Sequence, residues 1–225
     1  MSTRQDSNPS TSTLTPVEAR LIGCLMEKQR TTPDQYPLTL NALIGACNQK
    51  TARHPVMTLS PGEVAHAVNQ LRDRGLVHVS SSGRTERYDH KLVGTYFISR
   101  EEQALLCVLM LRGPQTLGEL RTNAVRLADF PTLDSVARAI RGLTERSPAL
   151  AIELPRVPGR REERYAHLLC GAPDEETAAA EFTPFSPAGT ARDDRIAALE
   201  AEVAALRDEV DRLWTLTGLT DRRNP

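Results

Sequence analysis

The chain has 225 residues, of which 40% are hydrophobic, and its formal net charge is −1. This length suits one large or two small domains with buried cores. The near-zero charge excludes the general electrostatic attraction that most nucleic-acid-binding proteins use, so any contact with DNA must rely on local patches.

The segment 14–98 reads as a first domain that begins with three helices. Thr15-Pro16-Val17-Glu18 is a capping box with proline at the first helical position, and an apolar stripe follows it at helical spacing. A second helix is carried by Leu40 and the apolar residues after it. Ser60-Pro61-Gly62-Glu63 is another capping box, and the helix that it opens is expected to end near Gly75.

A β-hairpin is predicted after the third helix. Its first strand is a β-type run at 77–79, a Ser-Ser-Ser-Gly turn follows, and its second strand lies around 88–97. Three helices followed by a two-stranded hairpin is the element order of a winged helix. We therefore expect an α+β, mostly α, domain.

The segment 99–170 reads as a second, tighter copy of this domain. Its first helix is apolar nearly all round, which predicts a position at the junction of the two domains or at a dimer interface. The predicted signals and elements of this copy are, in order, a capping box at 99–102, a helix stop at Gly113-Pro114, a capping box at 116–119, a helix over 133–145 and strands at 151–154 and 165–169.

The two copies share landmarks in the same order. Arg87-Tyr88-Asp89-His90 returns as Arg164-Tyr165-Ala166-His167, and Glu18 of the first helix returns as Glu102. Recurrence of all landmarks indicates two complete domains.

Both ends of the chain differ from the repeats. Residues 1–13 and 171–192 have compositions typical of a disordered tail and a flexible linker, and a short tail occupies 218–225. The segment 193–217 is predicted to form a parallel coiled-coil homodimer, although a helix that folds back on its own chain is the alternative. Its a and d positions are Ile196, Leu199, Val203, Leu206, Val210 and Leu213.

The chain resembles the YceH-like family of bacterial proteins over about residues 14–217. Three stretches carry the resemblance: Leu38-Thr39-Leu40-Asn41-Ala42-Leu43, Ala46-Cys47-Asn48-Gln49-Lys50-Thr51 and Arg53-His54-Pro55-Val56-Met57. The resemblance implies a tandem winged-helix architecture with a coiled-coil tail. It implies no reaction and no ligand, because the family is largely uncharacterised.

Candidate binding residues lie on the third helix of each copy and on the hairpins. Asn and Gln side chains can read adenine edges in a major groove, whereas Asp73 nearby would repel phosphate. Arginines on the hairpins can grip phosphate, or they can belong to a solvated surface of mixed charge. The candidates are His66, Asn69, Gln70, Arg84, Arg87, Arg138, Arg141, Arg160, Arg161 and Arg164.

The motif loop between the second and third helices allows two interpretations. Gln49, Lys50 and Arg53 can contact a phosphate or a partner near the start of the third helix. Alternatively, Asn48 ends the second helix and the loop side chains satisfy local backbone groups.

No pattern of catalytic, cofactor-binding or metal-binding residues is found in the sequence, and we expect a protein that is not an enzyme. His90 and His167 read as strand-end histidines with hydrogen-bonded rings. The four cysteines are scattered without a C-x-x-C pair, which favours buried, reduced thiols. The longest strongly apolar stretch, 104–111, is too short to cross a bilayer, and a soluble, cytoplasmic protein is expected.

Two classes of function agree with these features. The first is a dimeric DNA-binding regulator, which the repeated winged-helix pattern and the coil favour. The second is a protein-interaction module without DNA binding, which the neutral charge and the acidic residues on the helix faces favour. The fold alone does not separate them.

Overall fold

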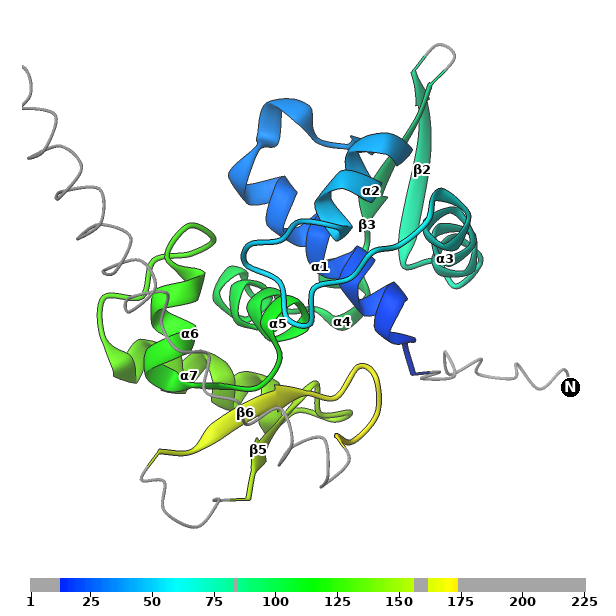
Figure 1. Cartoon of the computed structure of the whole chain (residues 1–225). Coiled ribbons are helices and arrows are strands. Elements are labelled where there is room, and N and C mark those ends of the chain that lie inside the picture. Colours follow the sequence, from blue (N-terminus) through cyan, green and yellow to red (C-terminus); the bar gives the residue numbers. More distant parts are fainter. Residues whose placement is uncertain (1–12, 83–84, 156–161, 174–225) are drawn as a thin grey trace, which may run out of the picture. The chain divides into compact units, whose positions relative to one another are not determined.

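The structure is a computed structural model that describes residues 13–82, 85–155 and 162–173 (Figure 1). All of these described residues belong to one compact unit. Several predicted segments lie outside the described residues: the tail before residue 13, the linker beyond residue 173, the coiled-coil helix at 193–217 and the tail at 218–225.

The described part of the chain is an α+β fold in which about half of the residues are helical. Its first half contains, in order, α1 (Pro16–Thr31), a 3-10 turn (Pro33–Gln35), β1 (Leu38–Thr39), α2 (Leu40–Cys47), α3 (Pro61–Asp73), β2 (Val77–Ser82), β3 (Thr85–His90) and α4 (Leu92–Tyr96). Its second half contains α5 (Arg100–Arg112), β4 (Gln115–Thr116), α6 (Leu117–Ala124), α7 (Leu133–Thr144), β5 (Ala151–Leu154) and β6 (Arg164–His167). Apart from the 3-10 turn and α4, the two halves have the same element order. We call them the first and the second repeat.

The helix starts follow the local sequence signals. In α1 the Thr15 amide donates to Glu18 Oε2 at 2.7 Å, and the Glu18 amide donates to Thr15 Oγ1 at 3.2 Å. The capping boxes predicted at 60–63, 99–102 and 116–119 are also present. All four predicted capping boxes are therefore confirmed. Each one pairs amides that a helix start otherwise leaves without a partner.

Each repeat carries a small antiparallel sheet with a third strand that the sequence did not reveal. The strand orders are β1-β3-β2 and β4-β6-β5. Leu38 pairs with Tyr88 in the first sheet, and Gln115 pairs with Tyr165 in the second. The added strands have only two residues each, which is too short for a recognisable alternation of apolar and polar side chains.

The predicted strand over 88–97 is wrong beyond His90. The Lys91 amide still donates to the Leu76 carbonyl at 2.9 Å, but the next residues form the short helix α4. Leu92 is fully buried, and the Lys91 carbonyl accepts a bond from the Thr95 amide at 3.0 Å. Insertion of Leu92 into the core thus outweighs the β propensity of this stretch.

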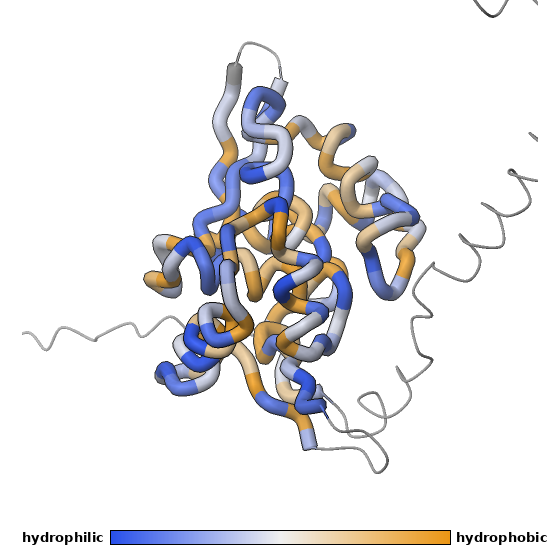
Figure 2. The backbone as a smooth tube through the Cα atoms, turned by 90° about the vertical axis from the view of Figure 1, so that its left-hand side faces the viewer, coloured by the Kyte–Doolittle hydropathy of each residue, from blue (hydrophilic) through white to orange (hydrophobic). Residues whose placement is uncertain are grey.

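The first helices of the two repeats pack against each other. Residues 103–111 of α5 are all buried, and Figure 2 shows apolar segments of the chain meeting in the interior. Cys107 Sγ donates to the Gly23 carbonyl at 3.4 Å, and Arg30 at the end of α1 bonds Gln103 in the first turns of α5 at 3.2 Å. The two helices therefore run antiparallel, and α5 lies at the junction of the repeats.

Gly23 permits the close approach of these helices. A Cβ atom at this position would lie 2.9 Å from Leu111 Cδ2, whereas a Cβ at Gly45 in α2 would meet nothing within 4 Å. We expect Gly23→Val to lower the free energy of unfolding by about 1–3 kcal/mol through overpacking. The matched Gly45→Val should change it by less than about 0.5 kcal/mol, since only helix propensity differs. Urea denaturation of both variants measures this, and equal effects would contradict the role of Gly23.

Candidate functional site

The outer face of α3 carries polar side chains that have no partner within the described residues. Val64, Val68 and Leu71 bury the inner face of this helix. His66, Asn69 and Gln70 lie on the opposite face, where their side chains are exposed and make no hydrogen bond to any described residue. Their donors and acceptors are thus available to a ligand or partner.

The equivalent helix of the second repeat presents a different surface. Arg138 Nη2 lies 2.9 Å from Asp134 Oδ2, and Arg141 Nε lies 3.9 Å from Glu145 Oε1. Both pairs are exposed and contribute little to stability. They cancel the charge of both candidate arginines on α7, so this face offers a partner no net positive charge.

The two described candidate arginines of the hairpins turn back onto the chain. Arg87 Nη1 donates to the Pro37 carbonyl at 2.8 Å. Arg164 Nη2 donates to the Pro114 carbonyl at the same place in the second repeat, and lies 3.8 Å from Glu119 Oε2. Arg87 therefore holds the added strand β1 against its hairpin, and Arg164 does the same for β4. The other hairpin candidates, Arg84, Arg160 and Arg161, lie outside the described residues.

The motif loop is tied to the helices around it. Asn48 follows the last residue of α2, and its side-chain amide bonds both backbone groups of Leu59 at 2.8 Å. The His54 amide donates to the Leu111 carbonyl at 2.8 Å, which fastens the loop to α5. Of the three residues considered for a phosphate contact, only Lys50 is exposed.

Arg53 of this loop is an interior residue. Its guanidinium donates to both carboxylate oxygens of Glu27, at 3.0 and 2.6 Å, and to Gln49 Oε1 at 2.8 Å. Its Nε also donates to the Ala46 carbonyl in the last turn of α2, at 3.2 Å. Burial by itself would raise the pKa of Glu27, but the hydrogen bonds and charge of Arg53 outweigh burial and lower that pKa. Arg53 and Gln49 are therefore occupied within the chain.

Arg20 is a second buried arginine at the same place. It is 1% exposed, and it donates to the Cys47 carbonyl at 3.3 Å and to the Pro55 carbonyl at 2.6 Å. Both arginines thus supply donors to the C-terminal end of α2, where helix carbonyls lack intrahelical partners. Arg20 and Glu27 were not predicted from the sequence, although a charged residue within the apolar stripe of α1 was a visible signal.

Removal of the Arg53 guanidinium should be costly. Arg53→Ala leaves the Glu27 carboxylate and the Ala46 carbonyl without their donor, and we expect the free energy of unfolding to fall by about 3 kcal/mol. Lys50→Ala in the same loop removes an exposed charge and should change it by less than about 0.5 kcal/mol. Denaturation in guanidinium chloride compares the two variants. Similar stabilities would show that the ion pair is dispensable.

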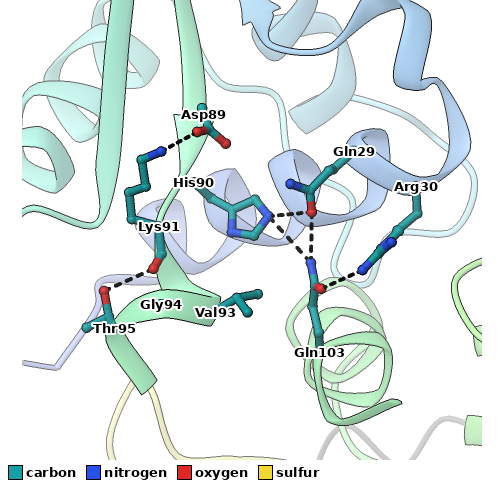
Figure 3. A pocket seen from close by; sticks show the side chains of 9 residues that line it. All are labelled: Gln29, Arg30, Asp89, His90, Lys91, Val93, Gly94, Thr95 and Gln103. Carbon is teal, nitrogen blue, oxygen red and sulfur yellow. Dashed lines mark hydrogen bonds and ion pairs between the residues drawn. The ribbon is translucent and has the colours of Figure 1, made fainter. Parts of the chain in front are cut away.

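A polar pocket lies where the repeats meet. It is open to solvent, has a volume of about 460 Å³ and is lined by Gln29, Arg30, Asp89, His90, Lys91, Val93, Gly94, Thr95 and Gln103 (Figure 3). His90 Nε2 lies 3.0 Å from Gln29 Oε1, and Gln103 Nε2 donates to the same oxygen at 3.1 Å. Gln29 Oε1 can only accept hydrogen bonds, so its contact with His90 Nε2 places the ring proton of His90 on Nε2. Gln29 and Gln103 were not predicted from the sequence, because no local motif marks them.

Of the two strand-end histidines, His90 is buried and His167 is half-buried, and both are uncharged. Burial lowers the pKa of His90 to about 4, and it lowers the pKa of His167 to about 4 as well. His90 has one bonded ring nitrogen, while its Nδ1 and the Nδ1 of His167 have no partner among the described residues. The expected hydrogen bonding of both rings is therefore seen only for Nε2 of His90.

These histidines predict a loss of stability in acid. The unfolded chain binds protons below about pH 6.5, whereas the folded histidines resist protonation until about pH 4. Their contribution is therefore complete above about pH 6.5 and is lost as pH falls toward 4, by up to about 3 kcal/mol for each. His90→Gln and His167→Gln should each flatten the dependence of the unfolding free energy on pH in this window. Exposed His78→Gln should not, and equal slopes for all four proteins would refute the assignment.

The cysteines are free thiols, and three of them, Cys24, Cys47 and Cys107, are buried. Within the described ranges, no group of three His, Cys, Asp or Glu side chains is placed to hold a metal ion. In the same ranges, no helix combines the length and apolar character that a membrane span requires.

The fold and these surfaces define an α+β protein made of two copies of one helix-and-hairpin unit. The family model described as "Protein of unknown function, DUF480" matches residues 14–160. The chain is 46% identical to a UPF0502 protein of Cellvibrio japonicus over 89% of its length and 94% of the relative. It is 48% identical to a UPF0502 protein of Vibrio vulnificus over 90% of its length and 96% of the relative. The chain belongs to this DUF480/UPF0502 family of bacterial proteins.

Proposed function

We propose that the protein is a DNA-binding regulator with two tandem winged-helix domains, and that it acts by binding rather than by catalysis. Each repeat has the supporting order of three helices and a hairpin, α1 to β3 and α5 to β6. The resemblance to the YceH-like family implies the same architecture. In such a domain the third helix enters the major groove, here α3 and α7.

The exposed face of α3 carries this proposal. The side chains of His66, Asn69 and Gln70 make no hydrogen bond within the described chain, so binding DNA does not require internal contacts to be broken. Asn and Gln amides can each donate to and accept from one adenine edge. Asp73 at the end of the helix is paired with Arg72 at 3.0 Å, which reduces its repulsion of phosphate. We therefore assign base reading to the first repeat.

The segment 193–217, which the sequence predicts to form a coiled coil, completes this proposal. A parallel homodimer through Ile196 to Leu213 would present two copies of α3 to two half-sites of one duplex. Phosphate contacts would come from Arg84, Arg160 and Arg161 on the hairpin turns.

A protein-docking module is the second candidate, and the surface of α7 favours it. The exposed arginines of α7 are each paired with an acid, and Leu133 at its start is 49% exposed. A helix face with balanced charges and an apolar residue suits a protein surface better than a phosphate backbone.

The experiment compares two double variants of the full chain. Asn69→Ala with Gln70→Ala should relax sequence preference in selection from random duplexes, at about 1–3 kcal/mol for each lost base contact, and should leave the salt dependence of binding in place. Asp134→Ala with Arg138→Ala on α7 serves as the matched control and should keep the preference. Fluorescence anisotropy over a range of salt measures affinity. Wild-type protein that binds no duplex at low ionic strength would leave docking as the better proposal.

A further inference from the structure

The pocket at the junction of the repeats has the size of a small-molecule site and a lining rich in polar side chains. Its residues come from the end of α1, the end of β3, α4 and the beginning of α5, so both repeats contribute. A volume of about 460 Å³ falls within the range of known ligand sites, about 300–1,000 Å³. Figure 3 shows Arg30 on one side of the lining and Lys91 on the other.

The floor of this pocket is a fixed polar network. His90 and Gln103 are 4% and 3% exposed. Both lie within hydrogen-bonding distance of Gln29 Oε1, and Arg30 Nη2 donates to Gln103 Oε1 at 3.2 Å. These contacts fix the side-chain carbonyl of Gln29 toward Gln103. In Figure 3 the amide nitrogen of Gln29 points away from Gln103. His90 is thus a positioning residue for the Gln29 amide.

Hydrogen-bond donors remain in excess at this pocket. The Asp89 carboxylate is satisfied by Lys91 Nζ at 2.6 Å and by the Tyr36 hydroxyl at 2.7 Å. The Gln29 amide nitrogen has no partner among the described residues, and Arg30 uses a single nitrogen there. With Arg30 and Lys91 as cations and Asp89 as the anion, the lining has a net charge of +1. Unused donors and positive charge select an oxyanion.

The second repeat shows that the fold does not need this network. The helices α1 and α5 correspond at a spacing of 84 residues, as Gly23 and Cys107 do. At this spacing Gln29 corresponds to Gly113 and Gln103 corresponds to Ala19. The equivalent place near His167 is thus built with small residues and without these amides. Buried polar groups that packing does not require, and that cost free energy to desolvate, indicate a binding role.

We propose that this pocket binds a small metabolite with an oxyanion group, a phosphate or a carboxylate, through the Arg30 guanidinium and the Gln29 amide. Both contact residues lie at the end of α1, where they hydrogen-bond Gln103 of α5, so a bound ligand would stabilise the junction of the repeats. This site is independent of the proposed DNA contact, which uses α3.

The test measures the thermal unfolding of the full-length protein in an oxyanion-free buffer, titrated with inorganic phosphate or with succinate. A saturable rise in Tm with either probe supports the site and identifies the chemistry that it prefers. Arg30→Gln should raise the dissociation constant at least about tenfold, because a charge-assisted hydrogen bond is lost. Arg126→Gln makes the same charge change at an exposed position that does not line the pocket and should leave binding unchanged.

A second variant separates the site from general charge effects. Gln29→Leu keeps the net charge and should also weaken binding, with circular dichroism showing that the protein remains folded. Two results would overturn the proposal: no saturable effect of either anion on the wild-type protein, or equal binding by Arg30→Gln and Arg126→Gln. DNA is absent from the assay, so a negative result leaves the proposed function of α3 standing.

Discussion

The packing of the first repeat depends on two buried arginines that meet the end of α2. Arg20 and Arg53 donate to the carbonyls of Cys47 and Ala46, and Glu27 balances the charge of Arg53. Without them, the end of α2 and the loop after it would expose unpaired backbone groups to the core. The loop sets where α3 begins, so the position of the proposed reading helix relies on an ion pair far from its outer face.

The sequence was most informative where a local rule decides the structure. Capping boxes located four helix starts, and the repeated landmarks located both halves of the described chain. It was least informative where distant contacts decide. The strand β3 ends before Leu92 because this side chain packs into the core. Arg53 faces inward because it forms an ion pair with Glu27 of α1. A loop rich in polar residues reads as a binding surface until the partners of those residues are known.

The two proposed sites differ in how far their residues are buried. The outer face of α3 takes part in no packing, so its side chains can serve recognition without a loss of stability. The pocket residues Gln103 and His90 are buried and depend on one another. The proposed DNA contact thus uses a surface that tolerates substitutions. The proposed ligand site uses residues in which each substitution disturbs a neighbour.

The contact between Gly23 and Cys107 has a consequence for symmetry. These residues occupy equivalent positions, and they touch at the crossing of α1 and α5. The two helices therefore meet as the subunits of an isologous dimer do, about an approximate two-fold axis at this point. In a dimer of identical chains both residues would have to be the same. Joining the repeats in one chain removes that constraint, so one side of the axis can be a glycine that admits Leu111 while the other is a buried thiol.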